Sequence, residues 1–509
     1  MNRDLSRTPS LTTLFLGGAF LWALTRPLLS GDLGWHIRVG QYVLDRHAVP
    51  HTNFLCFTAP WSHWLTHEWL ADVLFALLDA GGGLPALFLV RGLLFVTTLF
   101  LLLKLGRRTH AEPLALAGLL FFTGITLALN VALRPWMFSN LLLVVELLVL
   151  DQARDRPEKR WIRWCVVALL GLWVNLHGGF ALGLGLLLLE LLFWVVAPAK
   201  APGQPGTVRR FLEASCLGVC AFLVLIPNPH GMEALVLPID YLLGEQRTGL
   251  ALIGAIKEWS PIELGSFFGG VYLVWCLLGA LALLVSPEIR RRPAAWIGLV
   301  FLAFTLKAQR HLPVAALLLF PGVARGLLAP LSERLKQPSG RVGAYLAGLS
   351  RQEGASRRPF LAGLLVLIAG GYLTWSLQPG FDARAMEAKH YPLAAVQKLA
   401  NLPPRRVFNH CDWAGLMAWK APAWPLFITP VFDAYPREVL EDWLTIANLK
   451  PGWADLLKNR GVEAVFMPPD AALTATLKRT PGWFVVLEDR EAVLLARTGL
   501  DLEEPLPLW

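Results

Sequence analysis

Acidic and imidazole side chains gather between residues 30 and 70, in a stretch flanked by two strongly apolar segments. Asp32 can accept a proton from a substrate hydroxyl or hold a divalent cation such as Mg²⁺ or Mn²⁺. His36 follows four residues later, which places both side chains on one face of a helix. His67 and Glu68 open a second apolar run and are also proton-transfer groups. We therefore predict that Asp32, His36, His67 and Glu68 are catalytic, and that Asp32 and Glu68 can hold a metal ion.

Each of these residues also has a purely structural explanation. Asp32 precedes an amphipathic run and is a favourable helix N-cap, and a carboxylate such as Glu68 near a helix start interacts well with the helix dipole. The sequence is not a zinc-protease motif, because no second histidine follows His67 by four residues. It also contains no Gly-rich phosphate loop and no nucleophilic serine elbow, which disfavours nucleotide-driven chemistry.

Four further turns place cations, histidines and amides at the ends of apolar segments. Snorkelling of long cations and ordinary turn formation explain each of these turns alone. Together they surround the acids with cations, as a substrate with an anionic phosphate and a lipid tail would require. We predict that the donor phosphate is bound by Arg134, Lys307, Arg310 and His311. We predict that the rest of the site is lined by Arg91, Asn175, His177, Asn228 and His230.

These residues must be positioned by larger structural elements, and the composition indicates that these elements are membrane helices. The 509 residues are 55% hydrophobic and only 16% charged, with a mean hydropathy of +0.51, whereas soluble domains carry about 25% charged residues. Apolar runs long enough to cross a bilayer recur along the chain. We predict a mainly α, polytopic bundle of about eleven transmembrane helices at 11–29, 84–104, 114–132, 138–151, 162–175, 179–197, 211–226, 266–286, 294–307, 312–330 and 360–377.

The distribution of Lys and Arg predicts the orientation of this bundle. Alternate loops on one side carry 22 of these residues and the opposite loops carry seven, and the richer side is cytoplasmic. The N-terminus is then cytoplasmic, and the loop 30–83, the loop 227–265 and everything after residue 378 lie outside. The net charge of +9 is explained by the cytoplasmic loops, so we do not expect a nucleic-acid partner.

The composition changes after residue 378, which predicts two domains: a transmembrane domain over 1–378, whose external loop 30–83 contains interfacial helices, and an external α/β domain over 379–509. Short apolar runs there alternate with turn residues, as in small α/β domains. We expect strands at 406–408, 425–428, 464–467 and 484–487. We expect helices at 392–402, 437–449 and 453–460.

Nearly the whole chain resembles the GT-C superfamily of integral-membrane glycosyltransferases, and more closely a bacterial group of GT-C-like proteins without settled function. The resemblance is carried by the segments GDLGWHIRVGQYVLDRHAVPHTNF, THEWLADVLFALL, LRPWMFSNLLL, WVNLHGGFALGL, IPNPHG and AQRHLPVAAL, and near the C-terminus by VFNHCDWAGLMAW, FDAYPREV and GVEAVFMP. Relatives often show Asp-x-Asp in the first external loop. This chain has Ser30-Gly31-Asp32 instead, which departs from a metal site built on two adjacent carboxylates.

The resemblance implies a membrane glycosyltransferase, a hexosyl or pentosyl transferase of the cell envelope. It would transfer a sugar from a polyprenyl-phosphate donor to a glycan, lipid or protein acceptor. The site would face the outside of a bacterial inner membrane, with the C-terminal domain in the periplasm. Two alternatives remain open at this point. One is a transporter or flippase of lipid-linked glycans that uses Arg91, Glu146 and Glu190 within the membrane. The other is a non-catalytic assembly subunit, which the serine at position 30 would suit.

Overall fold

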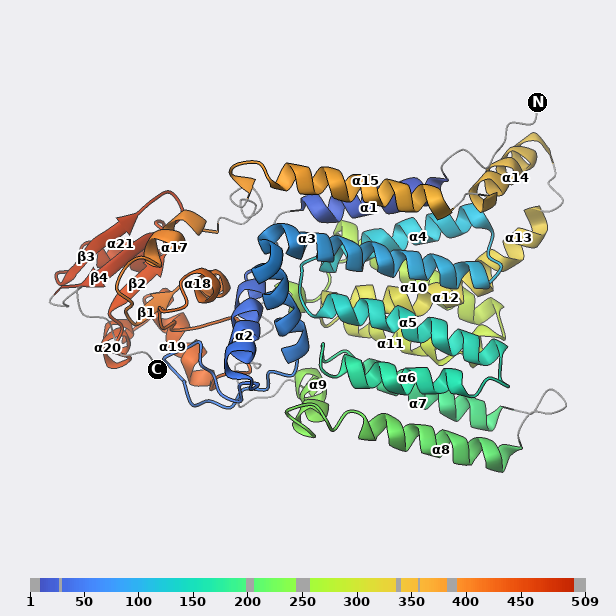
Figure 1. The fold of residues 1–509 in the computed structure, drawn as a ribbon, viewed down its shortest axis with the longest axis horizontal. Helices are drawn as coiled ribbons and strands as arrows, with labels where there is room; N and C mark the ends of the chain where they lie inside the picture. The colour runs from blue at the N-terminus through green and yellow to red at the C-terminus, as the bar shows by residue number, and fades with distance from the viewer. Residues whose placement is uncertain are drawn as a thin grey trace.

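The chain folds into a bundle of long helices with a small α/β region packed against one end of it (Figure 1). The computed structural model describes residues 10–26, 30–197, 206–243, 257–335, 340–355, 358–381 and 391–498. In Figure 1 the long helices lie roughly parallel, and helix α2 (Asp32–Arg46) lies between their ends and the α/β region.

Each of the eleven predicted spans coincides with a helix. These are α1 (Leu11–Thr25), α3 (Trp69–Arg108), α4 (Pro113–Leu127), α5 (Trp136–Asp155), α6 (Trp161–Trp173), α7 (Phe180–Val196), α8 (Thr207–Leu223), α10 (Phe267–Val285), α11 (Pro293–Thr305), α12 (Leu312–Val323) and α15 (Arg358–Ser376). Among the described residues, five helical stretches are long and apolar enough to cross a membrane, and five shorter helices are apolar. Helix α8 belongs to neither group, so the structure supports a polytopic membrane protein without fixing the number of crossings.

Shorter elements connect the bundle helices. They are η2 (Ala128–Asn130), α9 (Glu233–Leu243), η4 (Lys257–Trp259), η5 (Ile289–Arg291), η6 (Gln309–His311), the π-helical turn η7 (Ala324–Leu328), α13 (Ala329–Leu335) and α14 (Gly340–Ala355). At the end of the bundle remote from the α/β region, Asp151 forms ion pairs with Arg108, Arg292 and Arg325 at 2.8 to 2.9 Å. These pairs tie α3, α5 and the segments around η5 and η7 together.

The stretch 30–83 contains two helical segments. The first is α2, and the second is the beginning of α3, which continues directly into a membrane-crossing part. Gly83 separates the two parts of α3, because its φ of 60° and ψ of −153° are not helical and suit a residue without a side chain. Helices α2 and α3 pack closely, since a Cβ on Gly40 would lie 2.0 Å from the carbonyl oxygen of Asp72.

The α/β region is built on a four-stranded sheet with the order β1-β2-β4-β3. Strand β1 (Val407–Asn409) pairs in parallel with β2 (Ala464–Met467), and β4 (Val493–Arg497) pairs antiparallel with both β2 and β3 (Trp483–Glu488). The connecting helical elements are α17 (Leu393–Leu399), η9 (Cys411–Trp413), α18 (Ala414–Lys420), α19 (Arg437–Ala447), α20 (Trp453–Asn459) and α21 (Ala472–Leu477).

Two predictions for this region were wrong. The segment 425–428 is not a strand, and Leu426 forms only isolated bridges with Cys56 and Val407. The buried side chain of Asn409 accepts hydrogen bonds from the backbone N–H groups of Phe427 and Ile428, and the Phe427 N–H also donates to the carbonyl oxygen of Val407. Strand β4 was missed, because the polar turn before it hides its apolar pattern.

Glycines allow α2 and the α/β region to meet backbone to backbone. A Cβ on Gly415 would lie 1.7 Å from the carbonyl oxygen of Gly31, and a Cβ on Gly34 would lie 2.1 Å from that of Gly415. No other residue type fits at such distances. Asp32 therefore starts α2 at the contact between the bundle and the α/β region.

Candidate active site

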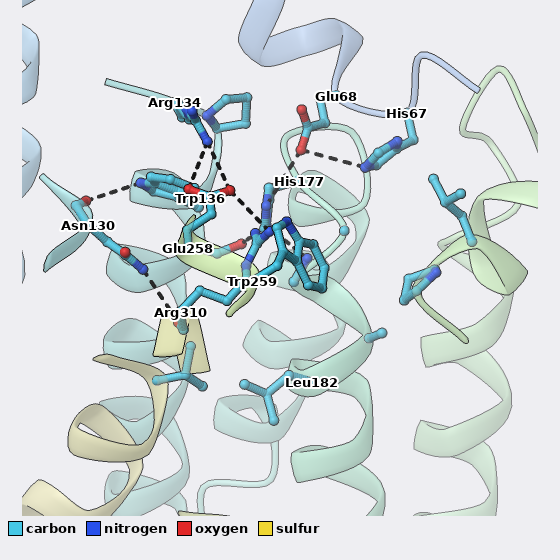
Figure 2. Close-up of a pocket in the computed structure, with 18 of the residues that line it drawn as sticks. His67, Glu68, Asn130, Arg134, Trp136, His177, Leu182, Glu258, Trp259 and Arg310 are labelled. Carbon is cyan, nitrogen blue, oxygen red and sulfur yellow. Dashed lines mark hydrogen bonds and ion pairs between the residues drawn. The ribbon is translucent and has the colours of Figure 1, made fainter. Parts of the chain in front are cut away.

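A cavity of about 1120 Å³ lies where the bundle meets the α/β region. Its walls come from the start of α2, the turn before α3, the segment from Asn130 to Leu143, helices α7 and α11, and the turns around η4 and η6. The α/β region contributes two short loops, at 411–412 and 430–433. Segments that are distant in the sequence thus enclose one space, and Figure 2 shows part of its wall.

Arg134 is held by three oxygen-bearing side chains. Its guanidinium forms an ion pair with Asp32 Oδ2 at 2.6 Å, and its Nε donates to Ser30 Oγ at 2.7 Å. Its remaining nitrogen donates to both carboxylate oxygens of Glu258 at 3.2 Å. Burial raises the pKa of Asp32, and the positive charge of Arg134 opposes that shift. Arg134 therefore keeps its charge paired although it is largely buried.

Arg310, from η6, lies next to the side chains that hold Arg134. Its guanidinium lies 3.5 Å from Glu258 Oε1 and stacks over the ring of Trp259, 4.2 Å from the ring centroid. The ring of Trp136 lies between the two arginines, 4.6 Å from the Arg134 guanidinium carbon and 5.6 Å from that of Arg310 (Figure 2). We call this set the arginine cluster: Ser30, Asp32, Arg134, Glu258 and Arg310. Lys307 and His311 line the same cavity.

A second polar group surrounds Glu68. Glu68 Oε1 lies 3.6 Å from Nε2 of His67 and 3.5 Å from Nε2 of His177 (Figure 2). Nδ1 of His177 accepts from the backbone N–H of Gly179 at 2.9 Å and lies 2.7 Å from the hydroxyl of Ser139. We call this set the histidine cluster: His67, Glu68, Ser139 and His177.

The hydrogen bonds fix which ring nitrogens carry protons in the neutral histidines. Nδ1 of His177 is an acceptor, so its proton is on Nε2 and points towards Glu68. Nδ1 of His67 donates to the carbonyl of Leu65 at 3.1 Å, so its Nε2 carries a lone pair. Burial raises the pKa of Glu68 to about 8, with a further contribution from the charge of Asp433, and burial lowers the pKa of His67 to about 4. The cluster is therefore close to neutral at pH 7.

His36 forms a buried pair with Asp72, which also lines the cavity. His36 Nδ1 lies 2.6 Å from Asp72 Oδ1, and both side chains are at most 3% exposed. Trp35 stacks on the imidazole with 3.6 Å between the ring centroids. Burial lowers the pKa of His36 well below its usual value, and the charge of Arg134 adds to the effect. The pair joins α2 to α3 next to both clusters.

An apolar arm extends the cavity along the helices. Ala181, Leu182, Gly185 and Leu189 occupy one face of α7 and line it, and so do Ile297, Phe301 and Phe304 of α11. A Cβ on Gly185 would meet nothing within 4 Å. The arm thus presents only hydrocarbon, and open space lies beside Gly185.

Most predicted site residues meet in this cavity. Those that line it are Asp32, His36, His67, Glu68, Arg134, His177, Lys307, Arg310 and His311. Arg91 does not line it: Arg91 is buried, donates to the carbonyl of Arg26 and stacks on Phe88.

Three other predicted residues hold the loops in place rather than line the cavity. Asn175 accepts a hydrogen bond from the Trp69 indole at 2.8 Å and another from Asn228 at 3.2 Å. His230 Nε2 lies 3.0 Å from the hydroxyl of Thr66, which donates to a neighbouring backbone carbonyl. These contacts fasten the segment before Glu68 to the bundle.

Several cavity residues were missed from the sequence. Asp72 follows Glu68 by four residues, a spacing that places both on one helical face. Glu258 and Trp259 are an acidic and an aromatic residue next to each other in a loop, and this composition could have identified them as cavity residues. Asp412 and Asp433 gave no local signal, because they reach the cavity only through the docking of the α/β region.

The carboxylates do not fit the Mg²⁺ or Mn²⁺ site considered from the sequence. A divalent cation needs several oxygen ligands that converge on one point. Asp32 belongs to the arginine cluster, where a guanidinium already lies against it, and Glu68 belongs to the histidine cluster. Among the described residues, no group of three or more His, Cys, Asp or Glu side chains is arranged to hold a metal ion.

Comparison with solved structures establishes the fold. No family model and no curated protein sequence matches the chain. The apo crystal structure of the oligosaccharyltransferase from Archaeoglobus fulgidus superposes with a TM-score of 0.52 at 11% identity, covering 97% of this chain and 75% of that chain. ArnT from Cupriavidus metallidurans, also apo, gives 0.51 at 16% identity, covering 95% and 97%. Both are GT-C glycosyltransferases.

The chain has a GT-C-like membrane fold. The resemblance predicted from the sequence motifs is thereby confirmed at the level of the fold. The GT-C-like chain spans almost the full length of ArnT and three quarters of the oligosaccharyltransferase. At these identities the likeness concerns architecture, so the chemistry must be argued from the cavity itself.

Proposed function

We propose that this protein is a membrane glycosyltransferase that moves a hexosyl or pentosyl group from a polyprenyl-phosphate donor to an acceptor at the extracytoplasmic face. The observation that carries the proposal is a single cavity that joins two arginines to an apolar arm. A phosphate at the end of a hydrocarbon chain requires this combination of surfaces. The glycosyltransferase activity of the structural neighbours is consistent with it.

In the proposed complex the donor phosphate binds Arg134 and Arg310, and the polyprenyl chain follows the arm between α7 and α11. Guanidinium groups bind phosphate oxygens through paired hydrogen bonds. Lys307 and His311 line the same part of the cavity and add donors for the leaving phosphate. The negative charge that develops on this phosphate during transfer is then stabilised by fixed cations.

Asp32 is the proposed proton acceptor, and the donor phosphate activates it. In the structure its carboxylate is paired with Arg134, which makes it a weak base. A phosphate that takes over the guanidinium releases this carboxylate, whose pKa burial raises. The acceptor oxygen then bonds to the anomeric carbon, the sugar–phosphate bond breaks with its electron pair on the phosphate, and the acceptor proton passes to Asp32.

The histidine cluster and the two loops of the α/β region are proposed to hold the acceptor. His67, Glu68 and His177 present both donors and acceptors of hydrogen bonds and carry little net charge, which suits a hydroxyl-bearing acceptor. His36, which is paired with Asp72, lies next to these residues and is proposed to hold them in position. We also propose a transmembrane domain over 1–378 and an external domain over 379–509, and the change in composition after residue 378 supports this division.

We propose that the cavity faces the outside of a bacterial inner membrane, with the N-terminus cytoplasmic and the C-terminal region periplasmic. The support is the excess of Lys and Arg in the opposite loops. Ion pairs of Arg108, Arg292 and Arg325 lie at the end of the bundle remote from the cavity. This placement agrees with that orientation.

The charges within the bundle give less support to a transporter. Glu190 pairs with Arg154, Arg91 binds a backbone carbonyl, and neither lines the cavity. Glu146 is buried against Gly183, again away from the cavity. A transport path would require such groups to line a continuous polar space.

Mass spectrometry of lipid that copurifies with the full-length protein tests the donor class, and a polyprenyl-phosphate sugar is the expected species. The copurified or added lipid then serves as donor in a transfer assay. Asp32→Asn should abolish transfer while leaving the unfolding temperature close to that of the wild type. Asp45→Asn, at an exposed position on the same helix, is the matched control. Full activity of Asp32→Asn would show that Asp32 is not the proton acceptor.

A further inference from the structure

The guanidinium of Arg134 is surrounded by oxygen donors of the kinds that bind hard cations. The hydroxyl of Ser30, the carboxylate of Asp32 and the carboxylate of Glu258 contact it at 2.7, 2.6 and 3.2 Å. Oxygen donors from carboxylates and hydroxyls are the ligands that Mg²⁺ and Mn²⁺ prefer. Each nitrogen of the guanidinium is bonded to one of these three residues.

The surroundings keep the guanidinium in this position. Trp136 stacks against it at 4.6 Å, and Ser30 Oγ also accepts from the backbone N–H of Asp32 at 3.1 Å. Ser30 therefore orients the Asp32 backbone and the Arg134 side chain at once. An aspartate at position 30 would instead place a third carboxylate beside the same guanidinium.

We propose that Arg134 is a built-in replacement for a divalent cation, so that this site neutralises phosphate with its own guanidinium and does not take up a metal ion. The proposal deepens the proposed function, on which it rests only for the identity of the ligand. It also explains Ser30: one carboxylate in the first loop is sufficient where the cation is part of the protein. Removal of the guanidinium should turn the same oxygen atoms into a metal site.

Binding of Mn²⁺ to the purified full chain, followed by electron paramagnetic resonance, tests the proposal without any donor. The wild type should show no Mn²⁺ site that depends on Asp32. Arg134→Gln should bind Mn²⁺ at least about tenfold more tightly than the wild type, a readily measured difference. Arg134→Lys keeps a positive charge and should resemble the wild type. Circular dichroism and unfolding temperature establish that each variant is folded.

Two further variants identify the ligands. Asp32→Asn in the Arg134→Gln background should remove the new Mn²⁺ site. Ser30→Asp in that background should strengthen it, because two carboxylates then flank Gly31. A stoichiometric Mn²⁺ site in the wild type that Asp32→Asn abolishes would overturn the proposal, as would a folded Arg134→Gln variant that gains no Mn²⁺. Neither result depends on glycosyl transfer, so a failure here is distinct from a failure of the proposed function.

Discussion

In the arginine cluster, guanidinium groups lie against carboxylates, whereas in the histidine cluster burial shifts the pKa values of Glu68 and His67 towards the neutral forms. Both clusters line one cavity, and both contain a carboxylate from the stretch 30–70. The two carboxylates differ in the side chains that contact them. Asp32 has a guanidinium at 2.6 Å, and Glu68 has two imidazoles beyond 3.4 Å.

Two carboxylates in different environments can take different roles. Burial raises the pKa of Asp32, and the charge of Arg134 opposes that shift. Glu68, with a pKa of about 8, carries a proton near neutral pH and can donate a hydrogen bond. The comparison therefore suggests that the arginine cluster stabilises charge and that the histidine cluster forms neutral hydrogen bonds. Experiments on each cluster test that difference.

The largest effect is expected from Arg134→Ala. Loss of a fixed donor that stabilises developing charge costs about 10²–10³-fold in rate. The loss should deepen towards low pH, because the charge of Arg134 also opposes the rise in the pKa of Asp32. Arg46→Ala, at the exposed end of α2, should have no effect. The measurement is the transfer rate from pH 6 to pH 9. A transfer rate close to that of the wild type would show that Arg134 does not stabilise the leaving phosphate.

Gly185→Leu should weaken donor binding without touching either cluster. The added side chain would fill the open space beside Gly185 in the apolar arm. A leucine there would occupy space that the donor chain is proposed to fill, so we expect less copurified lipid and a KM for donor about tenfold higher, which corresponds to about 1.4 kcal/mol. Gly270→Leu makes the same change at an exposed position of α10 with open surroundings. Equal lipid content in both variants would argue against the arm as the chain-binding site.

Gly415→Ala should disturb the arginine cluster more than the histidine cluster. The added Cβ would lie 1.7 Å from the carbonyl oxygen of Gly31, next to Ser30 and Asp32. We expect a loss of about 1–3 kcal/mol in the free energy of unfolding, as for other overpacked contacts. The measurement is the shift in thermal unfolding, with Gly348→Ala as control because nothing lies near that glycine. An unchanged unfolding temperature would mean that this backbone contact opens readily.

Glu68→Gln should alter the pH dependence of stability. The pKa of Glu68 is raised to about 8 in the folded protein from about 4.5, so ionisation disfavours the folded state as pH rises between these values. His67 has its pKa lowered to about 4 from 6.5, so its contribution is complete above pH 6.5. Between pH 6.5 and 8 the unfolding temperature of the wild type should therefore fall relative to that of Glu68→Gln. Parallel curves would show that Glu68 is already ionised.

The sequence predicted the bundle well because hydropathy acts locally. Each predicted span falls on a helix. Helix α14, Gly340–Ala355, was not predicted. Its Glu353 accepts hydrogen bonds from the first backbone N–H groups of α1, at Leu11 and Thr12, and such a tertiary contact leaves no local pattern.

Many of the residues that line the cavity were named from the sequence, but their pairing was not. Residue types at turn positions identified Asp32, Glu68, Arg134 and Arg310, because charged groups at helix ends are conspicuous in an apolar chain. Their partners depend on distant segments: Glu258 reaches Arg134 from a loop more than 100 residues away. Asn228 and His230 had the same composition signal as the cavity residues, yet they fasten a loop. Spacing alone could not separate these two uses.

Part of the cavity wall comes from two short loops of the α/β region, at 411–412 and 430–433, while the arginines and the apolar arm belong to the bundle. Loops tolerate sequence change better than packed helices. Under the proposed function, related proteins are therefore free to diversify the two loops while they preserve the arginines and the apolar arm. In evolutionary terms, acceptor preference would then drift separately from donor preference, and comparison of these two loops among homologues would reveal that drift.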